Sequence, residues 1–332
     1  MARRRRNSSR RLFVTLALLA AIGGTGYWYL SGDRTRQKAL SEDYAHIPVT
    51  SDRPEASSLD GGPYADVPER GNSPEHTDNR PKLDAERQRA LLAAGRRTME
   101  QGQLVTARAQ LSEALRYGLP LQETVQLRAE LSKLAGQTIL SNAILPDDPF
   151  VEAYVIQPGD ALGKIAKRYR VTEDLLAQIN GIADKNHIRA GQRIKVVQGP
   201  FYAVIRLADY TLDVYLHDTF IKSYPVGLGA DRSTPPGTWV VQSKLKNPQY
   251  YPPHGGKIIL ADDPENPLGE RWIGLKGIEG QALGQERYGI HGTIEPDSIG
   301  KSASLGCIRM HNPDVEELYN LLVVNHSKVT VK

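Results

Sequence analysis

The sequence predicts a multidomain α+β protein with an N-terminal transmembrane helix, a helical spacer, a small β-α-α-β module and a β-rich C-terminal domain. Three observations predict this organisation. An uncharged apolar run lies near the N-terminus, apolar residues recur at helical spacing over residues 83–140, and short alternating strand patterns dominate the chain beyond residue 199. A chain of 332 residues is long enough for two or three domains.

The N-terminal segment has the pattern of a membrane anchor. Residues 1–11 carry six arginines and no acidic residue, and residues 12–30 form an uninterrupted uncharged run. A transmembrane helix needs about 20 apolar residues, and basic residues stay on the cytoplasmic side. We therefore expect a cytoplasmic basic segment over 1–11 and a single-pass signal anchor over 12–30, with the rest of the chain outside the cytoplasm. A cleaved signal peptide is the alternative, since it also begins with basic residues.

The charge distribution does not indicate nucleic-acid binding. Of the 42 basic side chains, six are the arginines of residues 1–11, and the remaining 36 face 38 acidic ones. The formal charge of +4 therefore belongs to the anchor and not to a basic face. The sequence shows no set of metal ligands and no phosphate-binding glycine loop, so it predicts no metal and no cofactor.

Two segments connect the anchor to the folded domains. Residues 31–82 are rich in Ser, Asp, Arg, Pro and Gly, which predicts a disordered linker. Over residues 83–140, apolar residues such as Leu104, Leu111 and Leu115 recur at helical spacing between glycine breaks. The spacing weakly resembles a tetratricopeptide-like helical hairpin. A plain helical spacer and a partner-binding module both remain open.

Residues 152–198 predict a β-α-α-β module. An alternating strand over 154–156 precedes Asp160, which is expected to be the N-cap of a helix with the sequence LGKIAKRY. Thr172 is expected to cap a second helix, and IKVV closes the module as a strand.

The motifs YVIQPGD, LGKIA and GQRIKVV make this module resemble a LysM domain over its whole length. The resemblance implies binding to glycans built from N-acetylglucosamine, notably peptidoglycan, in a groove between the first strand–helix loop and the second helix–strand loop. The candidate contacts are Gly159, Asp160, Ala161, Asn180 and Ile182. For most of them, helix capping or core packing is the alternative role.

The C-terminal part, residues 200–332, alternates short strand patterns with one clear helix. Asn312 and Pro313 are expected to open that helix as N-cap and first helical residue. The motifs STPPGTW, DPENPLGERWIGL, YGIHGT and SLGCIRMHN, in this order, resemble the catalytic domain of YkuD-type L,D-transpeptidases. The resemblance implies a mixed β-sandwich that carries a thiol nucleophile.

The residues themselves also indicate thiol chemistry. Cys307 is the one cysteine of the chain, and His291 is the candidate base that would take its proton. The resemblance implies that the backbone carbonyl of Gly292 orients this histidine. We expect the backbone amides of Cys307 and Gly306 to stabilise the oxyanion, because glycine permits the tight turn that would aim them. A buried structural cysteine is the alternative.

Further residues near the motif are assigned by their chemistry. Ser304 and Tyr288 are candidate oxyanion or substrate residues, although a core aromatic role is the alternative for Tyr288. Arg309 could bind a substrate carboxylate or form a structural ion pair. Leu305 stands where many family members have histidine, so any polar role of that histidine is missing. The stretch 247–280, rich in Pro and Gly, predicts a long loop over the site.

Together these features predict a membrane-anchored cell-wall enzyme that acts on peptidoglycan stem peptides and glycan strands. The resemblance implies that Cys307 releases terminal D-alanine from a tetrapeptide stem and that a second stem amine attacks the acyl-enzyme. An L,D-carboxypeptidase and an enzyme that attaches a protein lysine to the wall are alternatives at the same site. A non-catalytic wall-binding scaffold is the alternative of another class.

Overall fold

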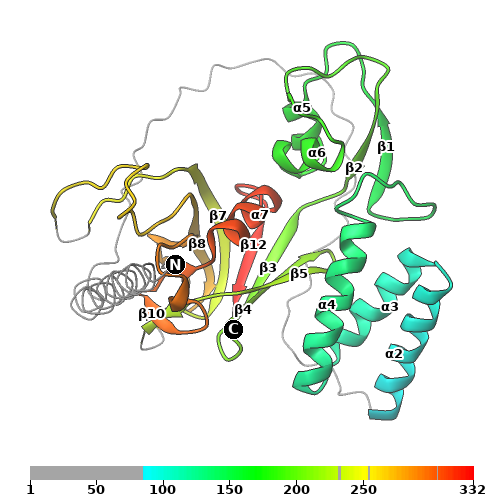
Figure 1. The fold of residues 1–332 in the computed structure, drawn as a ribbon, viewed down its shortest axis with the longest axis horizontal. Coiled ribbons are helices and arrows are strands. Elements are labelled where there is room, and N and C mark those ends of the chain that lie inside the picture. The colour runs from blue at the N-terminus through cyan, green and yellow to red at the C-terminus, as the bar shows by residue number, and fades with distance from the viewer. Residues whose placement is uncertain (1–84, 231–232, 253–254, 305) are drawn as a thin grey trace, which may run out of the picture.

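The computed structural model describes residues 85–332 except 231–232, 253–254 and 305 (Figure 1). The predictions for residues 1–11, 12–30 and 31–82, and the one for Leu305, lie outside the described residues. Among the helices of the described part, none is both long and apolar enough to cross a membrane.

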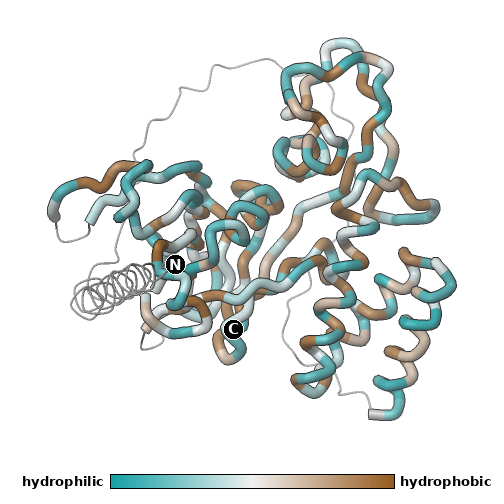
Figure 2. The backbone as a smooth tube through the Cα atoms, in the orientation of Figure 1, coloured by the Kyte–Doolittle hydropathy of each residue, from teal (hydrophilic) through white to brown (hydrophobic). Residues whose placement is uncertain are grey.

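Three helices open the described part, one more than a hairpin would have. They are α2 (Ala85–Glu100), α3 (Leu104–Arg116) and α4 (Leu121–Gln137). Hydrophobic and hydrophilic segments alternate along each of them (Figure 2). Gly102 and Gly118 follow α2 and α3 with φ of +76°, a conformation that favours glycine at helix ends. Leu111 lies so close to Gly95 that a Cβ there would be 2.6 Å from its side chain, which indicates a close crossing of α2 and α3.

The helical unit α2–α4 is docked on the C-terminal sheet. Leu127 and Leu131 of α4 share a core with Tyr215 and Phe220 of that sheet. In the same interface Arg128 donates to Asp213 across 2.7 Å, and Asp213 is fully buried. Figure 1 shows α4 beside the edge strand β5. The unit therefore packs against the C-terminal domain, whereas a plain spacer would not share a core with it.

The small module has the expected β-α-α-β order. Its elements are β1 (Val151–Val155), α5 (Leu162–Arg168), α6 (Glu173–Ile179) and β2 (Arg193–Val197). Strands β1 and β2 pair antiparallel. Thr172 caps α6 as predicted, accepting from the Leu175 N–H across 3.0 Å. The N-cap of α5 is Ala161 and not Asp160, because the Asp160 carboxylate accepts from the Tyr154 hydroxyl and the Gln157 N–H instead.

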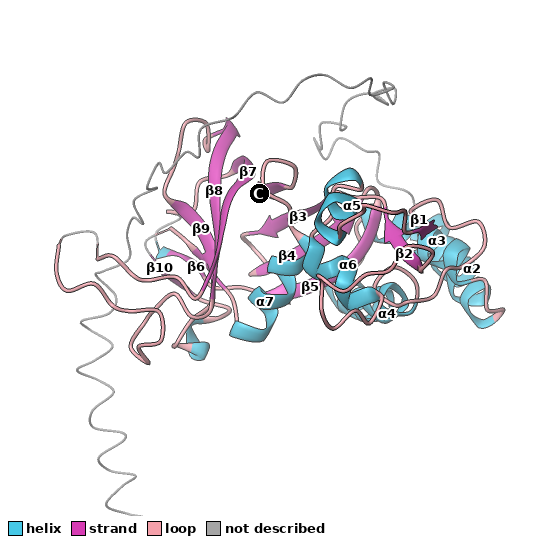
Figure 3. Cartoon of the chain, turned by 90° about the horizontal axis from the view of Figure 1, so that it is seen from above, coloured by secondary structure: helices cyan, strands magenta, loops and turns pink. Residues whose placement is uncertain are grey.

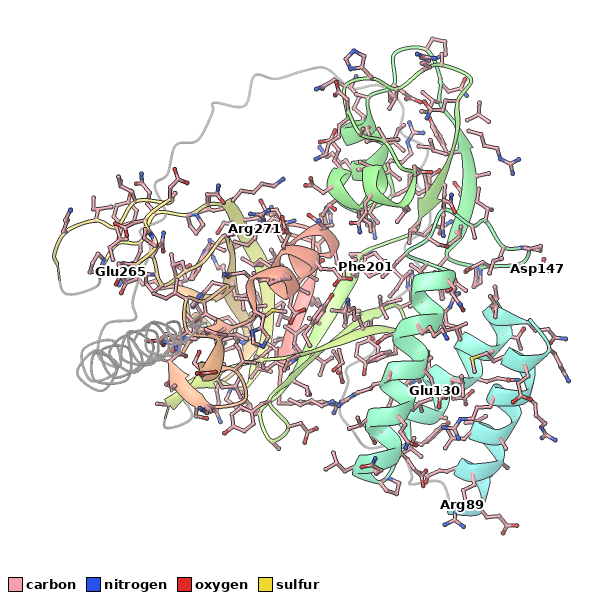
Figure 4. The ribbon with its side chains drawn as sticks, in the orientation of Figure 1. Arg89, Glu130, Asp147, Phe201, Glu265 and Arg271 are labelled. Carbon is pink, nitrogen blue, oxygen red and sulfur yellow. The ribbon has the colours of Figure 1, made fainter. Side chains whose placement is uncertain are left out.

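This module contacts both of its neighbours. The buried Lys195 ammonium of β2 donates to the carbonyls of Thr138 and Ser141, just beyond α4. The Thr172 hydroxyl donates to the carbonyl of Asn320 in the C-terminal domain. Phe201, fully buried, lies where the chain enters the sheet (Figure 4).

The C-terminal domain is built on one mixed sheet in place of the two facing sheets of a sandwich. Its eight strands run in the order β11-β9-β8-β7-β12-β3-β4-β5, and a short parallel pair, β6 and β10, lies beside them. The strands are β3 (Phe201–Arg206), β4 (Thr211–Leu216), β5 (Thr219–Pro225), β6 (Leu228–Gly229), β7 (Gly237–Lys246), β8 (Arg271–Gly280), β9 (Tyr288–His291), β10 (Ser302–Ser304), β11 (Ile308–Arg309) and β12 (Lys328–Val331). The sheet twists strongly between β7–β9 and β3–β5 (Figure 3). This twist gives the curved shape of a half-barrel.

One helix covers the part of the sheet that carries β8 and β9. Helix α7 spans Asn312–Leu321 and buries Val315, Leu318 and Tyr319. The predicted helix is confirmed, but its N-cap is His311, and Asn312 is the first helical residue. The long loop between β7 and β8, which includes Glu265, projects away from the sheet, whereas Arg271 at the start of β8 lies near α7 (Figure 4).

Candidate active site

Three neighbouring strands bring the motif residues together. In strand β9, His291 is in register with Trp272 of β8 on one side and with Arg309 of β11 on the other. Cys307 directly precedes β11. The candidate nucleophile and the candidate base, sixteen residues apart in sequence, therefore lie on adjacent elements at one edge of the sheet.

The His291 ring is held in one tautomer. Its Nδ1 lies 2.6 Å from the carbonyl oxygen of Gly292. A carbonyl can only accept, so Nδ1 carries the proton and Nε2 is the basic nitrogen. The ring is fully buried and stacks on the Trp272 indole with centroids 5.8 Å apart. This is the geometry of a neutral general base.

Burial keeps the His291 imidazole neutral. Desolvation, with a smaller effect of the positive Arg309, lowers its pKa to about 3, although the Gly292 carbonyl acts in the opposite direction. An unperturbed histidine titrates near pH 6.5. The resting imidazole is therefore unprotonated at neutral pH, with Nε2 carrying no proton.

The Cys307 thiol is half-buried against an apolar cluster. It packs on Tyr250, Leu268 and Trp272. Burial raises its pKa to about 11, while a hydrogen bond from the Gly289 backbone and the charge of Arg309 act in the opposite direction. Both members of the pair are thus neutral at rest. Thiolate must form as the proton moves to the imidazole.

Gly289 and Trp272 shape this site, and the sequence analysis gave Gly289 no role. A Cβ at Gly289 would lie 2.5 Å from the Trp272 ring, so only glycine lets the indole lie across β9. The Gly289 N–H is also the backbone group that reaches the thiol. The signal in the sequence was a glycine two residues before the histidine in the motif YGIHGT.

The turn before Cys307 corrects one prediction. The Gly306 N–H donates to the Ser304 hydroxyl across 3.2 Å, and that hydroxyl donates to the Cys307 carbonyl across 2.6 Å. The Gly306 amide is therefore already hydrogen-bonded within the turn. Of the two predicted amide donors, Cys307 N–H is left. Ser304, fully buried, shapes the turn.

Tyr288 and Thr234 hold the same turn from outside. Gly306 has φ of +136°, and a Cβ there would lie 2.7 Å from the Tyr288 ring. The Thr234 hydroxyl donates to the Gly306 carbonyl across 2.9 Å. Tyr288 also packs on Trp239, with ring centroids 5.0 Å apart. The structure thus gives Tyr288 a packing position beside the thiol.

Arg309 is buried in strand β11, in register with His291 of β9. Its side chain is 2% exposed and pairs with Glu295, with Nη1 and Oε2 3.0 Å apart. The structural ion pair therefore accounts for its position better than a contact with a substrate carboxylate.

The glycan candidates divide into two groups. An open pocket of about 580 Å³ in the β-α-α-β module is lined by Asn180, Gly181, Ile182, Ala183, Asp184, His187, Arg189, Ala190 and Gln192. Of the five glycan candidates, Asn180 and Ile182 line this pocket, and Gly159, Asp160 and Ala161 are not among its lining residues. The Asn180 side chain bonds the backbone of Leu176 and Lys195, and Asp160 bonds its own turn. These two side chains therefore serve the fold of the module.

No metal centre emerges from the part of the chain that the structure describes, since no three His, Cys, Asp or Glu residues there are placed to hold an ion.

Comparison with known proteins matches both domains. The YkuD L,D-transpeptidase catalytic domain matches residues 200–331, and the LysM domain matches residues 154–197. The chain is 34% identical over 186 residues to the Bacillus licheniformis protein named "Putative L,D-transpeptidase YkuD", covering 54% of this chain and 97% of that one. The protein of the same name from Bacillus subtilis is 33% identical over 186 residues, with the same coverage of 54% and 97%.

A solved L,D-transpeptidase from Mycobacterium smegmatis is also similar, at 16% identity and a TM-score of 0.30, covering 43% of this chain and 63% of that one. A likeness this low supports no inference of its own.

Proposed function

The chain belongs to the YkuD family of L,D-transpeptidases, and from that membership we propose that it is a cysteine-dependent acyltransferase of peptidoglycan. One observation carries the proposal. The 2.6 Å contact of His291 Nδ1 with the Gly292 carbonyl leaves Nε2 as the basic nitrogen, on the strand beside the Cys307 turn. A buried structural cysteine would not need an oriented, neutral imidazole on the adjacent strand.

In the first half-reaction Cys307 Sγ attacks the carbonyl that joins the diamino acid at stem position three to the terminal D-alanine. His291 Nε2 takes the thiol proton during the attack. When the tetrahedral intermediate collapses, the C–N bond breaks and the imidazolium returns that proton to the leaving amine of D-alanine. The product is a thioester between Cys307 and the stem.

In the second half-reaction a side-chain amine of another stem attacks the thioester. His291 accepts a proton from the attacking nitrogen, and the C–S bond breaks. The thiol regains the proton, and a cross-link joins two third residues. The backbone N–H of Cys307 is the proposed oxyanion donor, because the Gly306 N–H donates to Ser304.

The β-α-α-β module is proposed to bind peptidoglycan glycan in the pocket that Ile182 and Asp184 line. The module contacts α7 of the catalytic domain through Thr172. Glycan held there would raise the local concentration of stems at Cys307. The proposed location is the outer side of the cytoplasmic membrane, with residues 12–30 as a single-pass anchor.

The reaction is tested with the full-length protein and purified disaccharide-tetrapeptides, with products identified by mass spectrometry. A cross-linked dimer that has lost one D-alanine supports transpeptidation, and both Cys307→Ala and His291→Gln should abolish it. A shortened monomer alone would indicate a carboxypeptidase in its place. Transfer to an added lysine-containing wall protein would indicate protein attachment. If wild-type protein yields none of these products, the proposed enzyme activity is wrong.

Glycan binding is tested by co-sedimentation of the full-length protein with purified peptidoglycan. Ile182→Asp places a charge in the pocket and should weaken binding by about tenfold or more, because it adds an unpaired carboxylate at an apolar contact. Val155→Asp places the same charge on an exposed β1 position outside the pocket lining and should bind like wild type. Equal binding by both variants would rule out this pocket.

A further inference from the structure

Asn312 holds the backbone directly after the candidate base. It is the first residue of α7, and both ends of its side-chain amide bond one residue, Thr293. The amide oxygen accepts from the Thr293 N–H across 3.0 Å, and the amide nitrogen donates to the Thr293 carbonyl across 3.1 Å. Two bonds from one planar amide fix the orientation of the peptide groups on both sides of Thr293.

The same amide oxygen is enclosed by two glycines. A Cβ at Gly292 would lie 2.0 Å from Asn312 Oδ1, and a Cβ at Gly269 would lie 2.2 Å from it. Gly292 follows strand β9, and Gly269 ends the loop before β8. Any side chain at either position would displace the amide. The two glycines and Asn312 therefore form one seat for the turn after His291, which we call the Asn312 seat.

The carbonyl that orients His291 belongs to this seat. Gly292 C=O accepts from His291 Nδ1 at 2.6 Å, and the Thr293 N–H that Asn312 Oδ1 holds belongs to the same peptide group as that carbonyl. We propose that Asn312 is a positioning residue that fixes the Gly292 carbonyl and thereby sets the tautomer of His291. The kinetic consequence rests on the proposed transpeptidase function, but the tautomer does not depend on it.

Two substitutions and a matched control test this role in the full-length protein. Asn312→Ala removes both bonds, and we expect kcat to fall by about 10- to 100-fold with KM within about twofold, since a displaced base affects the reacting geometry. Asn312→Asp keeps the shape and the acceptor oxygen but loses the donor to the Thr293 carbonyl, so it should show an intermediate loss in kcat. Asn320→Ala changes an asparagine of the same helix outside the seat and should behave like wild type.

NMR of nitrogen-labelled histidine gives a readout that is independent of turnover. Wild type should show the Nδ1–H tautomer of His291, identified by its disappearance in His291→Gln. Asn312→Ala should convert it to a mixture of both tautomers, which a merely structural loss of stability would not do. If wild type shows this tautomer but forms no cross-link, the proposed function fails and the positioning proposal stands. If Asn312→Ala and Asn312→Asp both keep the Nδ1–H tautomer and wild-type kcat, the positioning proposal is wrong.

A second test covers the case in which Asn312→Ala folds poorly. Gly292→Ala should reduce activity strongly because its Cβ meets Oδ1, whereas the double variant Gly292→Ala/Asn312→Ala removes that clash. We expect the double variant to lose no more activity than Asn312→Ala alone, because both changes act on one seat. Independent, multiplicative losses would show that the two residues do not act together.

Discussion

Glu295 and Arg309 form an ion pair near the reacting groups, with Nη1 and Oε2 3.0 Å apart and the Arg309 side chain almost completely buried. The Arg309 charge acts on both reacting groups, since it lowers the pKa of the His291 imidazole and of the Cys307 thiol. Glu295 therefore partly balances a cation that the site uses. Arg309, which the sequence suggested as a substrate-binding residue, therefore acts through its charge on the pKa values of His291 and Cys307.

Glu295→Gln should leave this cation less balanced. We expect the free energy of unfolding to fall by about 1–3 kcal/mol, because a buried guanidinium loses a charged partner. At a given pH the alkylation rate of Cys307 should rise, since more positive potential favours the thiolate. KM for the stem peptide should stay within about twofold. A large rise in KM with unchanged stability would instead place the pair in the substrate site.

The Cys307 thiol should react slowly with alkylating agents at neutral pH. Burial raises its pKa to about 11, so at pH 7 about one molecule in ten thousand is thiolate, against a few per cent for a free cysteine. The alkylation rate by iodoacetamide should therefore rise about tenfold per pH unit up to about pH 11. Since the chain has one cysteine, mass spectrometry reads this site alone. A rate plateau near pH 7 would instead indicate a preformed thiolate–imidazolium pair.

His291 should make the folded state sensitive to acid. Its folded pKa of about 3 lies below the unfolded value of about 6.5, so between these values the unfolded chain binds a proton that the folded protein does not. The stability is fully present above pH 6.5 and falls as the pH drops towards 3, by about 1.4 kcal/mol per pH unit. Urea unfolding of wild type and His291→Gln at several pH values measures this slope. An equal slope in both proteins would contradict the assignment to His291.

Much of the candidate site could be predicted from local sequence. Cys307, His291 and Gly292 lie in two short sequence motifs. Strands β9 and β11 pair with each other and so bring these two motifs side by side. Thr172 caps its helix as expected because the N-cap bond closes within three residues. Such features depend on the immediate chain, and a sequence pattern contains that information.

Polar residues with several possible partners could not be assigned in the same way. Asp160 and Asn312 are both residue types that favour the N-cap position. In the structure, however, the side chain of Asp160 forms a hydrogen bond with Tyr154, and that of Asn312 forms one with Thr293. The Gly306 N–H donates to the Ser304 hydroxyl, although the sequence motif predicted that it would stabilise the oxyanion. The choice between partners depends on which backbone lies nearby in the folded protein, and no local pattern specifies it.

Gly289→Ala should damage the site more than its small size suggests. The added Cβ would meet the Trp272 ring at 2.5 Å, and that ring stacks on His291. We expect a loss of about 1–3 kcal/mol in stability from overpacking, with a fall in kcat as the indole moves.

Gly136→Ala is the matched control for this prediction. Its Cβ meets nothing within 4 Å in the last turn of α4, so the substitution should be neutral or stabilise by up to about 1 kcal/mol. Thermal unfolding and turnover of both variants measure the difference. Equal behaviour would show that Trp272 has room to move.

The docking of the helical unit α2–α4 should contribute measurably to stability. Arg128 and Asp213 are 85 residues apart in sequence, and their side chains are 10% and 0% exposed. Arg128→Met removes one of three side chains that donate to the buried Asp213 carboxylate. Because Arg206 and Ser223 still donate to that carboxylate, we expect the free energy of unfolding to fall by about 1–3 kcal/mol. Urea unfolding measures it, and a second transition would show the helices leaving the sheet first.

Arg96→Met provides the matched control within the same unit. Arg96 pairs with Glu130, but their side chains are 41% and 31% exposed, and pairs this open contribute between about 0 and 1 kcal/mol. The expected order is therefore a larger loss for Arg128→Met than for Arg96→Met. If both variants unfold at the same urea concentration in one transition, the buried ion pair does not contribute to the docking of the helices on the sheet. The docking would then depend on the shared apolar core of Leu127, Leu131, Tyr215 and Phe220.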